Sequence, residues 1–204
     1  MYLNYTVLNN YYSESQIRDM CFENVGNPIK VQYEVIGEAN PTTLRYIKVM
    51  GDLEKYFGDI SNLVVTEIGI GYGGQARIIT SQHIPKEYNL VDLDEVLKLG
   101  EKFLKLCTSY KYFKYVSGNK IEELHSDLLI SNYAFSELTR SVQDEYLNKV
   151  IKNSKRGYVT YNHINPDYFN SYSIYEFAEK IPNSRIIEEV PLTHPDNKIV
   201  IWGN

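Results

Sequence analysis

The chain has 204 residues, enough for one domain with a substantial core, and 43% of them are hydrophobic, as is usual for a globular protein. Its net charge is −5 and no block of Lys or Arg is present, which argues against long nucleic acids as partners. Met1–Asn10 lacks the features of a signal peptide, and no apolar run approaches the length of a membrane span. Cys21 and Cys107 show no metal-ligand spacing and suit a reducing compartment. We therefore expect a cytoplasmic protein without membrane contact.

Residues 1–60 hold too little apolar sequence for a core of their own. A short helix is predicted over Ser15–Asn24, an extended segment over Ile29–Val35 and a loop over Gly37–Pro41. Pro41–Phe57 is a clearer helix, because apolar side chains recur at spacings of three and four and a proline occupies its first turn. Gly58 ends that helix. We expect residues 1–60 to form a helical cap beside a domain formed by residues 61–204.

A glycine-rich stretch, Leu63–Gly74 (LVVTEIGIGYGG), follows the cap. Its first half is rich in Val, Thr and Ile, which favour a strand, and Gln75–Ser81 then has the character of a helix. The glycines between them permit positive φ and close approach of a ligand, and the helix start offers free N–H groups. A strand that enters a helix in this way forms a cradle for an anionic or nucleoside ligand.

After the glycines, predicted strands and helices alternate. Alternation of this kind predicts an α/β fold with a parallel sheet covered by helices on both faces. The helix after the second strand is expected to turn Val96, Leu99, Phe103 and Leu106 inward. Further strands are predicted at Glu87–Leu93, Tyr112–Val116, Asp127–Ser131, Gly157–Tyr161, Arg185–Val190 and Lys198–Trp202, and helices at Asp94–Leu106, Ser141–Asn153 and Ser173–Lys180.

The last two predicted strands are joined by only seven residues, Pro191–Asn197. A parallel crossover needs a dozen or more. These strands must therefore pair antiparallel or lie apart.

The glycines allow more than one interpretation. Gly69, Gly71 and Gly74 fit G-x-G-x-x-G, the dinucleotide fingerprint, although that match is weak when it stands alone. The longer pattern adds Gly73 and an acid, Glu67, two residues before the first glycine. It resembles motif I of the class I S-adenosylmethionine-dependent methyltransferases. A glycine-rich turn that merely connects a strand to a helix is the third possibility.

Asp92 is predicted to end the second strand, 23 residues after Gly69. An acid about 20 residues past such glycines hydrogen-bonds ribose hydroxyls, and this suits a dinucleotide site and a methyltransferase equally. Asp92 could instead cap the next helix, but Asp94 is better placed for that role.

Five sequence blocks together resemble the sugar O-methyltransferase family, and the resemblance spans about Gly37 to Asn204. It implies a Rossmann-like seven-stranded, mostly parallel sheet with a C-terminal antiparallel hairpin, which an NAD(P)-binding oxidoreductase does not require. It also implies S-adenosylmethionine as cofactor and a hydroxyl of a sugar or related small polar molecule as acceptor. Many relatives carry a glycine where this chain has Ile70. The blocks are TEIGIGYGGQARII (66–79), YNLVDLDEVL (88–97), LLISNYAFSEL (128–138), RGYVTYNHI (156–164) and NKIVIWGN (197–204). The resemblance implies that the cofactor-binding residues are Glu67, Gly69, Gly71, Gly73, Gly74, Asp92 and Asn132.

A sugar hydroxyl is a weak acid, so methylation requires a general base or a metal ion. His163 is the predicted general base and Glu137 its rival, because both follow predicted strand ends where ligands of such sheets bind. His163 could equally be an ordinary loop histidine, and Glu137 could cap the next helix. Metal-dependent sugar methyltransferases have carboxylates where this chain has Asn132 and Asn162, so we expect no metal.

Two other functions remain open from the sequence. Asn132–Phe135 has the N-x-x-F skeleton of nucleic-acid amino methyltransferases but lacks their prolines, and the chain lacks a basic groove. A methyltransferase-like domain that binds a cofactor or partner without catalysis would keep the same glycines and Asp92.

The chain also has nineteen tyrosines, which a biased genome would explain but which could stack on a sugar ring if they cluster near a pocket. The sequence does not indicate the oligomeric state.

Overall fold

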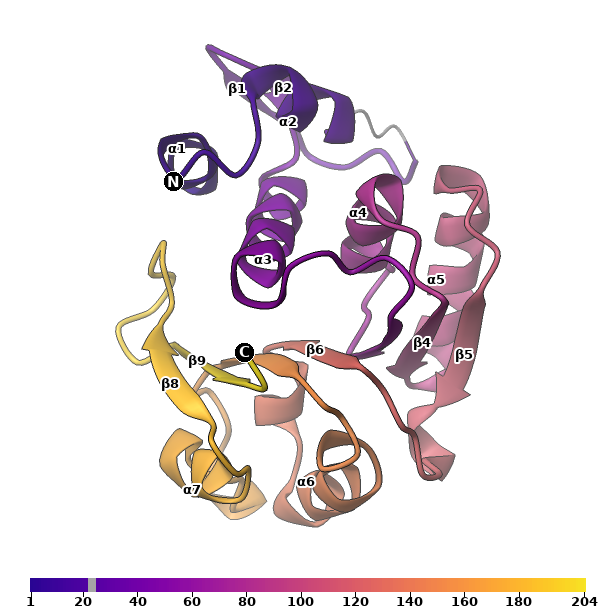
Figure 1. Cartoon of the computed structure of the whole chain (residues 1–204), viewed down its shortest axis with the longest axis vertical. Helices are drawn as coiled ribbons and strands as arrows, with labels where there is room; N and C mark the ends of the chain where they lie inside the picture. Colours follow the sequence, from indigo (N-terminus) through magenta and orange to yellow (C-terminus); the bar gives the residue numbers. More distant parts are fainter. Residues whose placement is uncertain (22–24) are drawn as a thin grey trace.

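The computed structural model describes residues 1–21 and 25–204, without the side chain of Leu8. A seven-stranded sheet in the order β5-β4-β3-β6-β7-β9-β8 forms its centre (Figure 1). Strands β3 to β7 pair in parallel, whereas β9 runs antiparallel to both of its neighbours, β7 and β8. The strands are β3 (Val64–Ile68), β4 (Glu87–Asp92), β5 (Phe113–Ser117), β6 (Leu128–Asn132), β7 (Gly157–Tyr161), β8 (Arg185–Glu188) and β9 (Lys198–Trp202).

The predicted C-terminal hairpin is confirmed. Arg185 pairs with Ile201 and Glu188 with Lys198, and residues 189–197 form the connection. Because this connection is too short for a crossover, β9 returns antiparallel and lies between β7 and β8.

Helices cover both faces of the sheet, as the alternation predicted. Helices α3, α4 and α5 lie on one side, and α6 and α7 lie on the other (Figure 1). The helix predicted over Ser141–Asn153 is α6 followed by a π-helical turn. The bounds are α3 (Pro41–Phe57), α4 (Gly74–Gln82), α5 (Asp94–Cys107), α6 (Arg140–Tyr146), the π-helical turn η3 (Leu147–Ile151) and α7 (Ile174–Glu179), with short 3₁₀ turns η1 (Gly118–Lys120), η2 (Ala134–Glu137) and η4 (Asp167–Phe169).

The predicted inner face of α5 was partly wrong. Phe103 is buried and Val96 is partly buried, as predicted, but Leu99 and Leu106 are 56% and 72% exposed, and Leu97 and Leu104 are buried in their place. The physical reason is Gly100, where an added Cβ would lie 2.8 Å from the Ile70 side chain. Close approach at this glycine fixes the rotation of the helix about its axis.

The first 40 residues contain more structure than the sequence indicated. The sequence did not predict helix α1 (Tyr2–Leu8). The prediction of a loop at Gly37–Pro41 was wrong, because Gly37–Ala39 forms strand β2, which pairs antiparallel with β1 (Val31–Tyr33). Both elements are too short to show a hydrophobic period. Helix α2 (Glu14–Met20) falls within the predicted Ser15–Asn24 segment apart from its first residue, and residues 22–24 of that prediction lie outside the described residues.

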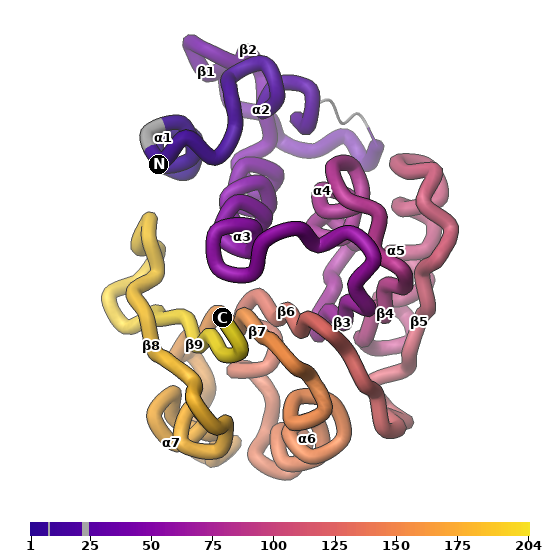
Figure 2. The backbone as a smooth tube through the Cα atoms, viewed as in Figure 1, coloured from indigo at the N-terminus to yellow at the C-terminus, as the bar shows by residue number. Residues whose placement is uncertain are grey.

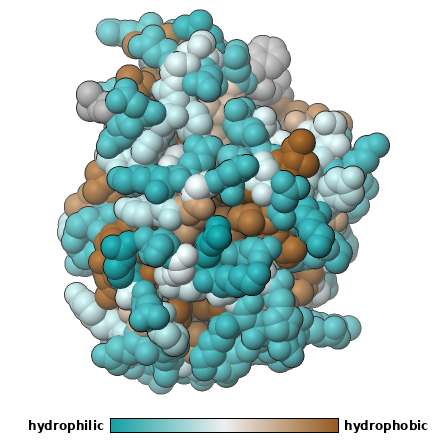
Figure 3. All heavy atoms as spheres, viewed as in Figure 1, coloured by the Kyte–Doolittle hydropathy of each residue, from teal (hydrophilic) through white to brown (hydrophobic). Residues whose placement is uncertain are grey.

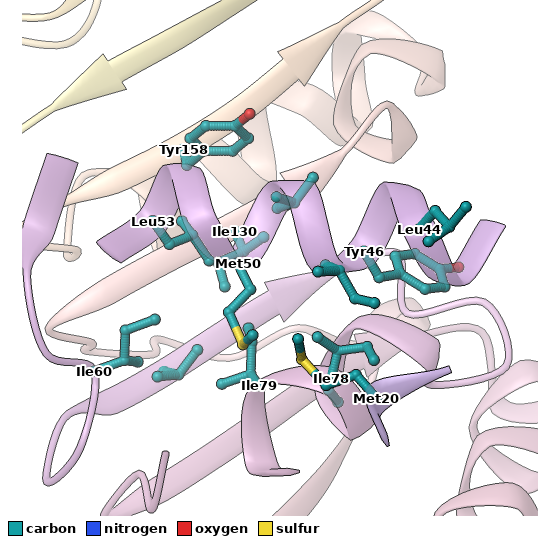
Figure 4. Packing of buried hydrophobic residues seen from close by; sticks show 14 of the residues in the cluster. Met20, Leu44, Tyr46, Met50, Leu53, Ile60, Ile78, Ile79, Ile130 and Tyr158 are labelled. Atoms are coloured by element: carbon teal, nitrogen blue, oxygen red, sulfur yellow. The ribbon is translucent and has the colours of Figure 1, made fainter. Parts of the chain in front are cut away.

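Helix α3 is central to the core between the sheet and the N-terminal segment. Met50 of α3 points toward Ile79 of α4, and Tyr158 of β7 lies on the other side of the helix (Figure 4). The Tyr158 hydroxyl donates to Asp52 Oδ2 over 2.7 Å, and the buried Lys48 ammonium pairs with the same oxygen. Leu3, Ile17 and other residues of α1 and α2 join this cluster, so residues 1–60 share a core with the sheet.

Among the described residues, no helix combines the length and the apolar character that crossing a bilayer requires. The face seen in Figure 3 is mostly hydrophilic, and its hydrophobic atoms lie in small separate groups.

Candidate functional site

The glycines between β3 and α4 serve two different purposes. Gly69, Gly71 and Gly73 all have positive φ, so the turn itself requires them. A Cβ on Gly69 would lie 2.0 Å from Ala134 Cβ, and one on Gly74 would lie 2.2 Å from the Tyr46 ring. A Cβ on Gly71, in contrast, would meet no atom within 4 Å. Gly71 is therefore the glycine that borders open space, where a ligand has room to approach.

Asp92 ends β4 directly beside Gly71. Its Oδ2 accepts from the Gly71 N–H over 3.2 Å and its Oδ1 accepts from the Leu93 N–H over 2.8 Å. β3, where the chain enters the glycine turn, lies between β4 and β6, so the strand order changes direction there. Ligands of open α/β sheets bind at such a point, beyond the carboxyl ends of the strands.

Ser117 ends the adjacent strand, β5, and pairs with Asp92 in the sheet register. Its Oγ is buried and has no hydrogen-bond partner among the described residues. A buried hydroxyl without a partner is costly, so it indicates that a polar ligand group completes this corner. Asp92, Ser117 and Gly71 together suit a ribose or a nucleoside.

Glu67 lies under the glycine turn and is 2% exposed. Burial raises its pKa to about 8; the hydrogen bond from the Tyr88 hydroxyl, 2.8 Å from Oε2, opposes this rise and the charge of Asp92 adds to it. The carboxyl is therefore mostly neutral at pH 7. The sequence pattern identified Glu67 but did not indicate its protonation state.

Replacing Glu67 by glutamine is expected to flatten the dependence of stability on pH. The folded protein holds the Glu67 proton up to about pH 8, whereas the unfolded chain releases it near 4.5. The wild type should therefore lose unfolding free energy as the pH rises through this window, by about 1.4 kcal/mol for each unit of pKa difference. Urea unfolding at a series of pH values measures the slope. An equally steep loss in Glu67→Gln would show that another group is responsible.

Asn132, at the end of β6, connects the sheet to two helices. Its Nδ2 donates to Gln75 Oε1 over 3.4 Å, and Gln75 Nε2 donates to the carbonyl oxygen of Tyr46 over 3.1 Å. Gln75 is completely buried at the start of α4. Gln75 could not be singled out from the sequence, because its role depends on contacts between three distant segments.

The two candidate bases lie near Asn162, which follows β7. Glu137 is exposed, and its Oε1 accepts from Asn162 Nδ2 over 2.7 Å. His163 is also exposed, and its ring centroid lies 5.8 Å from that of Tyr161. His163 borders a cavity of about 400 Å³ whose wall includes Arg140 and other residues around α6 and α7. Within the described residues, neither candidate hydrogen-bonds to Asp92 or Gly71.

A cluster that sequence reasoning missed lies between the N-terminal segment and the ends of the strands. It consists of Tyr2, Arg45, Tyr46, Tyr133 and Glu189, and we call it the Arg45 cluster. The Arg45 guanidinium carbon lies 5.3 Å from the Tyr46 ring centroid and 5.5 Å from that of Tyr133. The Tyr133 hydroxyl donates to the Glu189 carboxylate. Its members come from four separate segments, so no local sequence pattern predicts the cluster.

Among residues 1–21 and 25–204, no group of three or more His, Cys, Asp and Glu side chains is arranged to hold a metal ion.

Comparison with known proteins identifies the fold. No family model matches the chain, and no curated protein matches it either. Solved structures do match: PigF with S-adenosylhomocysteine, at 13% identity, TM-score 0.52 and 78% of this chain; and a magnesium protoporphyrin IX methyltransferase from Synechocystis PCC 6803 with the same ligand, at 8%, 0.56 and 78%. An rRNA methylase from Streptococcus thermophilus matches at 12%, 0.53 and 77%. The chain has the class I methyltransferase fold.

The share of each solved structure that this chain covers differs among the three. The chain covers 58% of PigF, 82% of the Synechocystis enzyme and 95% of the Streptococcus one. Shared by all is the methyltransferase fold, and the antiparallel β9 between β7 and β8 agrees with it. The sequence-based preference for a methyltransferase fold over a dinucleotide-binding fold is thus confirmed.

Proposed function

We propose that this chain is an S-adenosylmethionine-dependent methyltransferase that methylates a hydroxyl group of a sugar or a related small polar acceptor. The observation that carries the proposal is the corner formed by Gly71, Asp92 and Ser117 in this fold: open space above a glycine, beside a carboxylate and an unpartnered buried hydroxyl. Two of the similar structures hold S-adenosylhomocysteine, which supports the same cofactor here.

The residues at this corner fit the cofactor. Asp92 would accept hydrogen bonds from the ribose hydroxyls, and Ser117 Oγ would gain the partner that it lacks. Gly69, Gly73 and Gly74 hold the turn and its packing, with the neutral Glu67 beneath. Asn132 would face the cofactor from the end of β6. When bound, S-adenosylmethionine supplies an electrophilic methyl group.

The acceptor hydroxyl must lose its proton as the new carbon–oxygen bond forms. We propose Glu137 as the leading base and His163 as its rival, the reverse of the order that the sequence favoured. Asn162 fixes the Glu137 carboxylate on the segment that follows Asn132, whereas no hydrogen bond within the described residues orients the exposed His163 ring beside Tyr161. We further propose that residues 61–204 form the methyltransferase domain and residues 1–60 form a cap over its acceptor side. This arrangement needs no metal ion.

Replacing Asp92 by alanine is expected to weaken binding of S-adenosylhomocysteine by roughly 1.5–3 kcal/mol, the usual worth of hydrogen bonds to a charged group. Calorimetric titration measures the loss. Asp94→Ala is the matched control, because Asp94 begins α5 two residues away without reaching the Gly71 turn. Unchanged affinity in Asp92→Ala would place the ribose contact elsewhere.

Methyl transfer itself tests the proposed function. The protein is incubated with S-adenosylmethionine carrying a radiolabelled methyl group, and with either a mixture of sugars, sugar acids and sugar nucleotides or total RNA. The net charge of −5 supports a small acceptor, so label should enter the small-molecule fraction. Label in RNA would favour the activity named for the Streptococcus structure. Cofactor binding without transfer to any acceptor would favour a non-catalytic domain.

A further inference from the structure

The Arg45 cluster lies beside the segment that follows β6. Arg45 precedes Tyr46 on α3, and the carbonyl oxygen of Tyr46 accepts from Gln75, which in turn accepts from Asn132. Tyr133 directly follows Asn132. The cluster thus adjoins, on two segments, the hydrogen bonds that connect the end of β6 with α3 and the start of α4. Figure 2 shows the C-terminal hairpin, which carries Glu189, approaching α1, and the Tyr2 hydroxyl of α1 lies near Glu189 and Tyr133.

The charge of Arg45 is not matched by an ion pair. No salt bridge joins Arg45 to an acidic side chain within the described part of the chain, and its buried Nε has no hydrogen-bond partner. Its neighbours are the faces of two tyrosine rings, and the Tyr46 side chain also hydrogen-bonds the guanidinium. A partly buried guanidinium whose Nε lacks a partner is ready to bind an anion.

Glu189, the nearby acid, is already engaged elsewhere. It is 5% exposed, and its oxygens accept from the Tyr133 hydroxyl, from the backbone and hydroxyl of Thr193, and from Asn197 Nδ2. The Tyr2 hydroxyl lies near both charges: burial raises its pKa most, Glu189 raises it further and Arg45 lowers it. Glu189 therefore holds Tyr133 in place and leaves the guanidinium available.

We propose that Arg45 binds an anionic group of the acceptor, a carboxylate or a phosphate, while the partly exposed Tyr2 and Tyr133 rings border the sugar. The inference rests on the proposed function and adds that the acceptor is a charged sugar derivative, not a neutral sugar. Arginine suits this role because its planar N–H donors match the oxygens of carboxylate and phosphate groups. Tyrosine presents an apolar ring with a polar tip, which suits a sugar surface.

Binding of charged and neutral sugars tests this assignment. Protein saturated with S-adenosylhomocysteine is titrated with glucuronate, glucose 6-phosphate and glucose by calorimetry, and the Arg45 Nε–H resonance is followed by NMR. At least one anionic sugar should bind about tenfold or more tightly than glucose and shift that resonance. Glucuronate and glucose 6-phosphate separate a carboxylate from a phosphate as the recognised group.

Arg45→Gln removes the charge and should lower the affinity for the anionic sugar about tenfold or more. Arg185→Gln makes the same change in net charge on the exposed surface of β8 and should leave the affinity unchanged. Equal losses in both variants, no preference of the wild type for an anion, or no binding of either anion overturns the proposal. The wild-type comparison decides the matter even if Arg45→Gln fails to fold. Failure of S-adenosylhomocysteine to bind is a separate result that contradicts the proposed function, and titration of the ligand-free protein would still test Arg45.

Discussion

Gly71→Val is expected to abolish cofactor binding, with an affinity for S-adenosylhomocysteine at least about 100-fold lower than that of the wild type, or about 2.7 kcal/mol. The Cβ direction of Gly71 points into open space beside Asp92, so the isopropyl group would occupy the volume that the ligand needs. The chain itself has room for the new side chain, and the variant should fold with a loss that reflects backbone strain at φ +53°. Calorimetry and thermal unfolding measure the two effects separately.

Gly37→Val is the matched control for this variant. Gly37 also has positive φ, at +79°, and open space around its Cβ direction, but it lies at the start of β2 in the N-terminal segment. It should therefore share the strain and keep the affinity. A Gly71→Val protein that binds S-adenosylhomocysteine as tightly as the wild type would show that the ligand does not approach this turn.

Glu137→Gln is expected to lower turnover by roughly 10²–10⁴, the usual contribution of a positioned general base. Glutamine keeps the volume and can still accept from Asn162 Nδ2, so the local structure should persist. Affinity for S-adenosylhomocysteine should not change, because Glu137 makes no contact with Asp92 or the glycine turn in the described structure. Steady-state kinetics with the acceptor found by methyl transfer measure the loss.

His163→Gln is the variant to compare with Glu137→Gln. It should keep most of the turnover if the ring serves only to pack beside Tyr161. A loss of 10²–10⁴ in His163→Gln with a nearly normal Glu137→Gln would reverse the two roles.

The sequence was sufficient for the sheet because most of its strands contain short runs of apolar and β-branched residues that alternate with helical patterns. The length of the final connection alone excluded a parallel β8–β9 pair, and this distinguished the methyltransferase fold from a dinucleotide-binding one. The sequence was insufficient where an element is short, as in α1 and β2. It was also insufficient where the rotation of a helix about its axis depends on a particular neighbour. Gly100 against Ile70 is such a case, since only the packed structure shows why Leu99 faces outward.

Part of the site could be predicted because its residues stand at recognisable positions relative to two predicted strands. Gly71 and Asp92 follow strand ends in a recognisable spacing, so their proximity was expected before it was seen. The different tasks of the four glycines could not be read from the motif, because Ala134 and Tyr46 come from distant segments. The Arg45 cluster combines segments from both ends of the chain, and only tertiary structure brings Tyr2 close to Glu189.

Thermal unfolding with S-adenosylhomocysteine or NAD is the most direct test of whether this chain is a methyltransferase. A ligand that binds only the folded state at 100 times its Kd stabilises it by about 2.7 kcal/mol. For a chain of 204 residues this corresponds to a rise in Tm of roughly 5–10 °C. S-adenosylhomocysteine should produce this rise, and NAD at the same concentration should not. A rise with NAD and none with S-adenosylhomocysteine would contradict the assignment and make the glycine turn a dinucleotide site.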